Sequence, residues 1–212
     1  MIRPKPLKKG DTIGIIGTCS PPKKERIDPA IKWIKSLGLE VVIGRSVNEN
    51  HGYLCGEDKV RADDLNYMFH NKDIKGIFIV RGGYGAARIL NMIDYDNIKK
   101  NPKILAGYSD VTALHIAINQ KCKMITFHTP MLCTEFYTDI DDYTVESFKD
   151  SIFKINYTKK VVNPDKCKSF EGLVKGNACG RITGGNLSII ASLMGTPYEI
   201  NTKNKILFLE DI

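Results

Sequence analysis

The chain has 212 residues and a formal charge of +7 at pH 7, with 42% hydrophobic and 26% charged residues. This length can bury the core of one large domain or two smaller ones, and the composition excludes a disordered or fibrous protein. Basic residues occur in scattered pairs such as Lys8-Lys9 and Lys23-Lys24, without a long basic run or an aromatic–basic stripe. This pattern predicts a solvated surface and argues against a nucleic-acid groove.

The cysteines and the apolar stretches indicate the compartment. The six cysteines form no CxxC pair and have no spacing typical of metal ligands, so we expect reduced thiols, no metal and no cofactor. No stretch is long and apolar enough to span a bilayer, and the N-terminus does not resemble a signal peptide. The sequence therefore predicts a cytoplasmic protein with neither a nucleic-acid nor a membrane partner.

Short apolar strands alternate with helices along the first 130 or so residues. The predicted strands cover residues 12–16, 39–43, 76–80, 103–106 and 124–127. The predicted helices cover residues 27–37, 57–70, 86–93 and the stretch that follows Ser109. This alternation predicts an α/β fold, in which a doubly wound parallel sheet carries helices on both faces.

The pattern weakens in the middle of the chain and then resumes. We expect an N-terminal α/β domain over residues 1–132, a linker over residues 133–170 with a polar helix near its middle, and part of a C-terminal α/β domain over residues 171–212. A lone strand–helix–strand of about forty residues is too small to bury a core of its own. We therefore expect this second domain to be incomplete in the sequence, and residues from about 172 onward to be less stable and prone to self-association.

Ser109 falls where a buried strand turns into a helix, two residues after Gly107. Such a turn exposes a serine hydroxyl beside free backbone N–H groups, which are the two requirements of an acyl-transfer nucleophile. Taken alone, the stretch favours a serine that caps a helix, with Asp110 suiting the helix dipole, because Gly-x-Ser without a following glycine departs from the full nucleophile-elbow pattern. However, Gly17, Gly82-Gly83 and His128 also fall at carboxyl ends of predicted strands, where parallel sheets bind ligands, and this convergence favours catalysis.

A glycine-rich turn follows the third predicted strand, with the sequence Arg81-Gly82-Gly83-Tyr84-Gly85. It lacks both the Walker A pattern and the glycine order of a dinucleotide-binding turn. It fits either a tight turn whose glycines supply positive φ angles or an oxyanion hole in which the Gly83 N–H pairs with the Asp110 N–H.

Two carboxylates, Glu210 and Asp211, follow the last apolar strand. They fit a solvated strand end. They also fit an acid that orients a catalytic histidine, in the chain order serine, acid, histidine.

Four motifs in this order resemble the LD-carboxypeptidase family of serine peptidases, which includes murein tetrapeptide carboxypeptidases and microcin C self-immunity peptidases. The motifs are Arg81-Gly82-Gly83-Tyr84-Gly85, Gly107-Tyr108-Ser109-Asp110-Val111-Thr112-Ala113-Leu114, Gly184-Gly185-Asn186-Leu187-Ser188 and Ile206-Leu207-Phe208-Leu209-Glu210-Asp211. Each motif is weak alone, whereas the ordered set covers the chain and is specific.

The resemblance implies a Ser–Glu–His triad with Ser109 as nucleophile and Glu210 as acid, and an oxyanion hole from the Gly83 and Asp110 N–H groups. It implies a two-domain, homodimeric, cytoplasmic enzyme without a metal or other cofactor. The implied substrate is a murein tetrapeptide or another small peptide-like molecule. The implied reaction is hydrolysis of the amide between an L-centre and a terminal D-amino acid, during peptidoglycan recycling.

The sequence departs from the family pattern at two points. His128-Thr129-Pro130-Met131 stands where the family usually has His-Gly-Pro-Met, and no histidine follows Glu210. The four histidines are His51, His70, His115 and His128. None matches the triad position, so we expect this chain to be inactive, with His128 as the one conceivable substitute base. The alternatives are an immunity peptidase for aminoacyl-nucleotide antibiotics, an inactive peptide-binding module and a flavodoxin-like nucleotide-binding domain.

Overall fold

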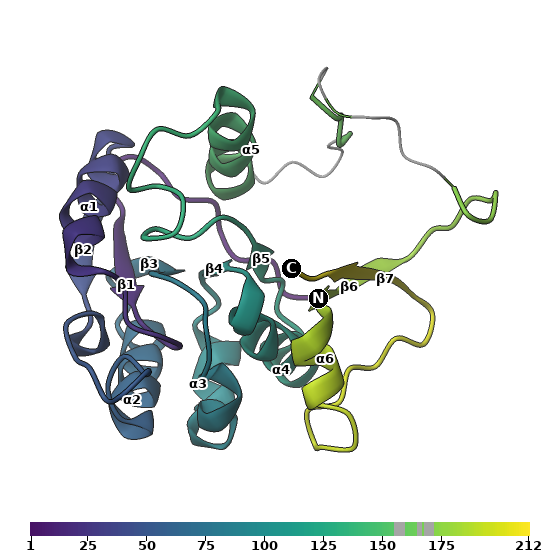
Figure 1. The fold of residues 1–212 in the computed structure, drawn as a ribbon, viewed down its shortest axis with the longest axis horizontal. Coiled ribbons are helices and arrows are strands. Elements are labelled where there is room, and N and C mark those ends of the chain that lie inside the picture. Colours follow the sequence, from purple (N-terminus) through teal and green to yellow (C-terminus); the bar gives the residue numbers. More distant parts are fainter. Residues whose placement is uncertain (155–159, 165–166, 168–171) are drawn as a thin grey trace.

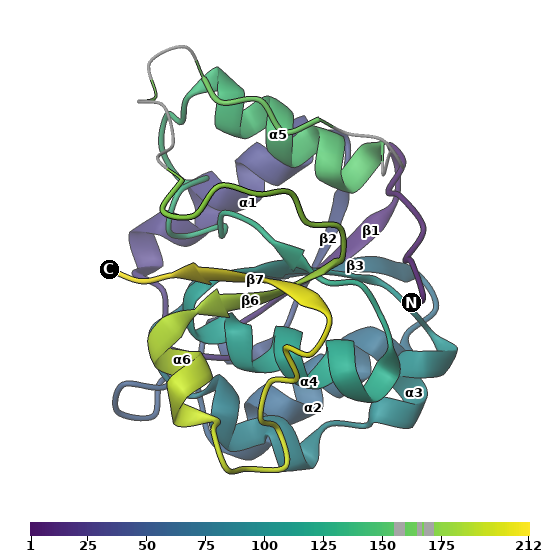
Figure 2. The same cartoon turned by 90° about the vertical axis from the view of Figure 1, so that its right-hand side faces the viewer.

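A parallel five-stranded sheet with helices on both faces forms the body of the protein in the computed structural model, which describes residues 1–154, 160–164, 167 and 172–212 (Figures 1 and 2). The strands are β1 (Thr12–Ile16), β2 (Glu40–Ile43), β3 (Ile74–Ile79), β4 (Ile104–Gly107) and β5 (Phe127–His128). The helices around them are α1 (Ile27–Ser36), α2 (Asp58–His70), α3 (Tyr95–Lys100), α4 (Thr112–Cys122) and α5 (Asp142–Phe153). Short 3₁₀ helices cover Lys24–Arg26 (η1), Arg45–Val47 (η2), Ala86–Met92 (η3) and Ser109–Val111 (η4). The predicted α/β class is confirmed.

The strand order is β2-β1-β3-β4-β5, and every neighbouring pair is parallel. This is a doubly wound order, in which consecutive crossovers place helices on opposite faces. Figure 2 shows α1 and α5 on one face of the sheet and α2, α3 and α4 on the other. The carboxyl ends of β1, β3, β4 and β5 consequently meet along one edge of the sheet.

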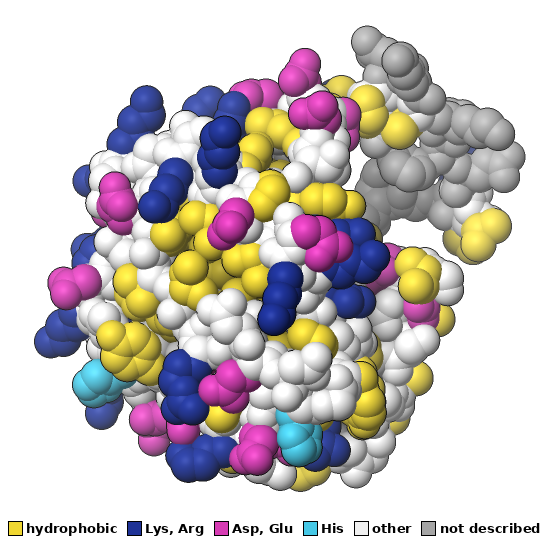
Figure 3. Space-filling view, turned by 60° about the vertical axis from the view of Figure 1, so that its left-hand side comes forward, with side chains coloured by type: hydrophobic (Ala, Val, Ile, Leu, Met, Phe, Trp, Pro, Cys, Tyr) yellow, Lys and Arg dark blue, Asp and Glu magenta, His cyan; other side chains and the backbone are white. Residues whose placement is uncertain are grey.

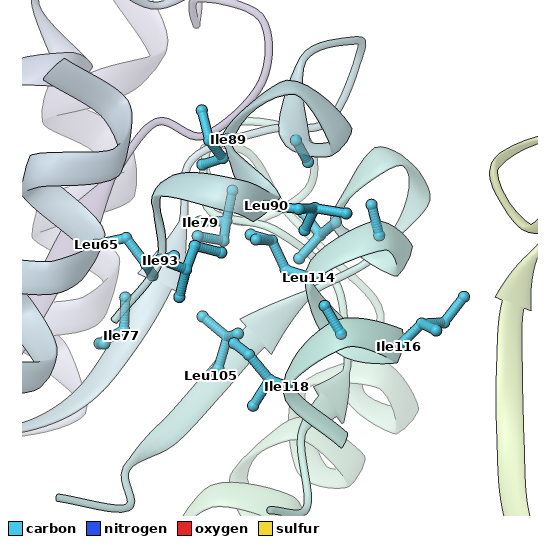
Figure 4. Close-up of a cluster of buried hydrophobic side chains, with 14 of the residues drawn as sticks. Leu65, Ile77, Ile79, Ile89, Leu90, Ile93, Leu105, Leu114, Ile116 and Ile118 are labelled. Atoms are coloured by element: carbon cyan, nitrogen blue, oxygen red, sulfur yellow. The ribbon is translucent and has the colours of Figure 1, made fainter. Parts of the chain in front are cut away.

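Each face of the sheet buries its own apolar cluster. On the α2–α4 face, Ile77, Ile79 and Leu105 pack against side chains from α2, η3 and α4, including Leu65 and Leu114 (Figure 4). On the other face, the strands pack against α1 and α5. The strands are thus apolar on both sides, as parallel strands between two helix layers require.

The α5 helix lies within the stretch predicted as a linker, yet it packs on the main body. Its Phe148 and Ile152 are buried in the same apolar cluster as Phe136, which lies in the loop before α5. Trp33 of α1 packs against this cluster and stacks on Phe136, with ring centroids 3.9 Å apart. Other parts of the predicted linker and residue 171 lie outside the described residues. The domain boundaries therefore stay a prediction.

The C-terminal residues form a second, two-stranded parallel sheet of β6 (Arg181–Asn186) and β7 (Lys205–Glu210), joined through α6 (Leu187–Ser192). Ile190 of α6 and the following Leu193 are buried in the same apolar cluster as α4. In contrast, four consecutive apolar residues of β7 are 37–45% exposed: Ile206, Leu207, Phe208 and Leu209.

The structure differs from the sequence prediction in three elements. The fifth strand covers Phe127–His128, whereas Met124 makes only an isolated bridge to Ile2. The stretch after the glycine-rich turn is 3₁₀ rather than α-helical, and α3 was not predicted. The α3 helix buries only Ile98 and depends on an Asp94 cap, so it has no apolar periodicity to detect.

Lys and Arg side chains are interspersed with Asp and Glu on the face shown in Figure 3. This agrees with the solvated surface that the scattered lysine pairs predict.

Candidate active site

Ser109 lies at the carboxyl end of β4, at the first residue of η4, and its φ angle is +61°. A left-handed conformation at a non-glycine residue costs about 1–2 kcal/mol and is concentrated at functional sites. The N-caps of η4 and α4 are Tyr108 and Val111, and neither helix has a side-chain cap. The Ser109 hydroxyl therefore caps neither helix, although the Ser109 carbonyl accepts from the Thr112 N–H at the start of α4.

The glycine-rich turn after β3 lies directly against Ser109. A Cβ added to Gly82 would stand 3.0 Å from the Ser109 Oγ, so any larger residue would crowd the hydroxyl. The next residue, Gly83, has a φ angle of +114°. The peptide that carries the Gly83 N–H thus adjoins the serine. Ser20 fixes this turn, since its N–H donates to the Gly82 carbonyl and its Oγ accepts from the Tyr84 N–H, both at 3.2 Å.

Asp110 joins the serine turn to the glycine-rich turn. Its Oδ2 accepts from the Ala86 N–H at 2.8 Å, and the side chain is buried. Burial raises the pKa of this carboxyl, and the Ala86 N–H opposes the shift. Within the described residues, neither the Asp110 N–H nor the Gly83 N–H donates to a protein acceptor. Two backbone donors beside one strained serine are the elements of an oxyanion hole.

Arg61 of α2 is a site-supporting residue that the sequence analysis did not identify. It is fully buried, and its guanidinium donates to the carbonyls of Thr18 and Gly85, at 2.5 and 2.8 Å, and to the Asp58 carboxylate. It thereby joins the loop after β1 to the glycine-rich turn. The sequence shows only an arginine within a mostly polar predicted helix. The fold shows that this arginine is buried and which loops it joins.

Glu210 is the last residue of β7 and pairs in register with Asn186 of β6. The Asn186 N–H donates to the Thr112 Oγ1 at 3.0 Å, which ties the end of the small sheet to the start of α4, three residues after Ser109. The Glu210 Oε1 is buried, has no hydrogen-bond partner within the described residues, and lies 4.0 Å from the His128 Nε2. Glu210 therefore reaches the same edge of the main sheet as Ser109.

No histidine hydrogen-bonds to Ser109 within the described residues, which include all four histidines. His51 and His70 are exposed. His115 is buried, with its Nε2 2.8 Å from the Gly107 carbonyl, and burial lowers its pKa to about 4. Burial also lowers the pKa of His128, although Glu210 opposes the shift. The ring of His128 packs edge-on against Tyr108 and Phe208.

Among the described residues, no group of three or more His, Cys, Asp or Glu side chains could hold a metal ion. No helix within these residues is long and apolar enough to cross a membrane.

Comparison with known families agrees with this geometry. Residues 13–129 match the LD-carboxypeptidase N-terminal domain, and residues 179–212 match the LD-carboxypeptidase C-terminal domain. The chain belongs to the LD-carboxypeptidase family, which confirms the resemblance seen in the sequence motifs.

Two curated relatives and two solved structures illustrate the similarity. The chain is 42% identical over 211 residues to a probable murein peptide carboxypeptidase of Bacillus subtilis, covering 99% of this chain and 65% of the relative. It is 33% identical over 235 residues to the microcin C7 self-immunity protein of Escherichia coli, covering 97% and 68%. An MccF-like protein from Bacillus anthracis superposes with a TM-score of 0.89 at 30% identity, covering 100% and 70%. A muramoyltetrapeptide carboxypeptidase from Oxalobacter formigenes gives 0.80 at 27% identity, covering 94% and 65%. The chain thus spans about two thirds of the length of these relatives.

Proposed function

We propose that this chain carries the nucleophile, the oxyanion hole and the acid of a serine hydrolase that cleaves the amide between an L-centre and a terminal D-amino acid in murein tetrapeptides. One observation carries the proposal: Ser109 is held at a φ of +61° at the end of β4, in a turn where a Cβ at Gly82 would crowd its hydroxyl, and that hydroxyl caps neither η4 nor α4. A strained serine at a strand-to-helix turn is the arrangement that presents a nucleophile in other hydrolases.

In this reaction, the Ser109 Oγ attacks the carbonyl carbon of the terminal amide and forms a tetrahedral intermediate. The Gly83 and Asp110 N–H groups donate to the negative oxygen of the intermediate. The general base takes the proton of the Ser109 hydroxyl during this attack. The amide C–N bond then breaks, and the protonated base gives that proton to the amine of the leaving D-amino acid. Water hydrolyses the acyl-serine and regenerates the hydroxyl. Removal of one oxyanion donor typically costs 100-fold or more in rate.

The general base is an imidazole that Glu210 orients. The buried Glu210 Oε1 has no partner within the described residues and is suited to accept an imidazole N–H. His128 is the nearest histidine, at 4.0 Å from this oxygen. However, its ring is held between Tyr108 and Phe208 and makes no hydrogen bond to Ser109 within the described residues, so we assign it no catalytic role.

Chemical rescue with free imidazole tests this assignment. The 212-residue chain is incubated with a murein tetrapeptide, with and without imidazole, and D-alanine release is measured by mass spectrometry. We expect negligible release without imidazole and a rate that rises with imidazole concentration. Ser109→Ala should abolish the rescued rate, and Glu210→Gln should reduce it strongly. Ser36→Ala, at an exposed serine of α1 whose hydroxyl bonds only the Trp33 carbonyl among the described residues, is the matched control and should leave it unchanged. A rescued rate that survives Ser109→Ala would refute the proposal.

The second candidate is hydrolysis of aminoacyl-nucleotide antibiotics. It is favoured by the similarity to the microcin C7 self-immunity protein, whose solved structures include a complex with aspartyl sulfamoyl adenosine. The same assay with this conjugate in place of the tetrapeptide separates the two substrates. A chain that binds either ligand without imidazole-dependent turnover would instead be a peptide-binding module.

We further propose a cytoplasmic homodimer that acts in peptidoglycan recycling. All six cysteines are free thiols, and four of them are buried, which suits a reducing compartment. The exposed apolar residues of β7 are suited to burial in a larger assembly. Size-exclusion chromatography with light scattering measures the oligomeric state directly.

A further inference from the structure

Two exposed aromatic rings pair beside the glycine-rich turn, and the reaction described above uses neither. Tyr84 is 50% exposed and Tyr53 is 63% exposed. Their ring centroids are 5.6 Å apart, with an angle of 61° between the ring planes. Tyr84 lies in the glycine-rich turn after β3, whereas Tyr53 lies in the loop between β2 and α2. The fold thus brings two separate turns together and forms an exposed aromatic corner.

Both rings stand on hydrogen-bonded turns. The Tyr84 N–H donates to the Ser20 Oγ, and the carbonyl of the next residue, Gly85, accepts from the buried Arg61. On the other side, His51 and Leu54 exchange backbone hydrogen bonds of 2.8 and 3.1 Å around Tyr53. Rigid aromatic rings bind ligands at a small cost in conformational entropy, because few rotatable bonds are immobilised.

The corner is within reach of a ligand bound at Ser109. A Cβ at Gly82 would stand 3.0 Å from the Ser109 Oγ, so Gly82 lies close to the serine. Tyr84 follows two residues later, a separation of at most about 7 Å along the chain. A group three residues before the scissile amide lies about 10 Å from it in an extended peptide. A substrate whose last amide lies at Ser109 can therefore place its far end against the two tyrosines.

The chemistry of the corner favours a ring with polar substituents. Neither phenol hydroxyl has a hydrogen-bond partner within the described residues. The neighbouring Arg88 is occupied by Asp58, to which it donates through both Nε and Nη2. The corner consequently offers apolar ring faces and two phenol hydroxyls that can bind polar substituents. The ion pair of Arg88 with Asp58 leaves neither of these two charges unpaired beside it.

We propose that Tyr53 and Tyr84 form a subsite that stacks a ring attached to the peptide-like substrate, with Tyr84 as the main stacking face. The ring is either the sugar of a murein peptide or the base of an aminoacyl nucleotide. This inference rests on the proposed function, because the ring must belong to a ligand whose amide lies at Ser109. The subsite acts on binding and touches no reacting atom.

Calorimetric titration of the 212-residue chain tests the subsite with three probes: a free tetrapeptide, the same peptide carrying N-acetylmuramic acid, and aspartyl sulfamoyl adenosine. We expect at least one ring-bearing probe to bind roughly 5- to 100-fold more tightly than the free tetrapeptide, as base–aromatic stacking does. Tyr84→Ala should remove most of this gain, Tyr53→Ala should remove part of it, and Tyr84→Phe should keep it. Tyr67→Ala is the control, since Tyr67 is 53% exposed on α2, near the opposite edge of the sheet.

The outcomes separate the subsite from the proposed function. The ring-bearing probe that binds more tightly identifies the sugar or the base as the stacked group. Tetrapeptide binding without any gain from a ring, or a gain that Tyr84→Ala leaves unchanged, would overturn the subsite and leave the proposed function standing. If none of the three probes binds, both proposals are wrong for this chain.

Discussion

Acid is expected to destabilise this protein through His115, a buried histidine in the middle of α4. Its Nε2 lies 2.8 Å from the Gly107 carbonyl, which can only accept, so the Nε2 carries a hydrogen. The Nδ1 is buried without a partner within the described residues. Protonation would place a charge on this nitrogen inside the core, and burial accordingly lowers the pKa of His115 to about 4.

The sign and size of the effect follow from linkage. The pKa of His115 in the fold lies below the value of about 6.5 in the unfolded chain, so its contribution is fully present above pH 6.5 and is lost as the pH falls towards 4. The two pKa values correspond to a total loss of about 3 kcal/mol in the free energy of unfolding, of which about 2 kcal/mol is lost by pH 5.

Urea unfolding at pH 7 and pH 5 measures this loss in the wild type and in His115→Gln. Glutamine offers an N–H to the Gly107 carbonyl and does not titrate. Subtracting the loss of the variant from the loss of the wild type cancels the contributions of the buried titratable groups that the two proteins share. Asp110 is one of these groups, and because its pKa is raised, its contribution to stability grows as the pH falls. We expect the wild type to lose about 2 kcal/mol more than the variant. Equal losses would show that His115 is not buried as a neutral ring.

Three further predictions concern the turns around Ser109 and the second sheet. Gly82→Ala places a methyl group against the Ser109 Oγ and should abolish imidazole-rescued turnover, whereas Gly76→Ala in β3 meets only ordinary contacts and should retain it. Arg61→Met should lower the free energy of unfolding by about 3 kcal/mol, because the Thr18 and Gly85 carbonyls lose their donor and Asp58 loses the buried one of its two arginine partners. Arg88→Met removes the exposed partner of Asp58 and should have a much smaller effect in the same urea titration. Hydrogen exchange should be faster in β7 than in β3, because β7 pairs only with β6 among the described residues, whereas β3 pairs with a strand on each side. Equal protection of the two strands would contradict this prediction and the expectation that the second unit is the less stable one.

The fold could be predicted from the sequence because its dominant signals are local. The apolar runs of β1, β3 and β4 alternate with segments of helical character, and buried parallel strands require such runs. The elements that escaped prediction have weak local signals. The β5 strand is only two residues long, and its place is set by pairing with Gly107 in β4. The α3 helix owes its position to a cap and to one buried isoleucine, Ile98.

The site was partly predictable for the same reason. Ser109, Gly83 and Asp110 lie in turns that follow strongly predicted strands, and the ends of parallel strands meet at one edge. The contacts that support them depend on long-range packing. Arg61 reaches loops 43 and 24 residues away, and no pattern in its own helix indicates this. The pairing of Tyr53 with Tyr84 likewise depends on how two loops meet.

The most direct test of the central claim is covalent labelling of Ser109. The 212-residue chain is treated with a fluorophosphonate in the presence of imidazole, and the modified residue is located by peptide mass spectrometry. We predict one phosphonyl adduct, located on Ser109 and absent from Ser109→Ala. An unmodified Ser109, or the same labelling in the alanine variant, would contradict the claim that this strained serine is the nucleophile.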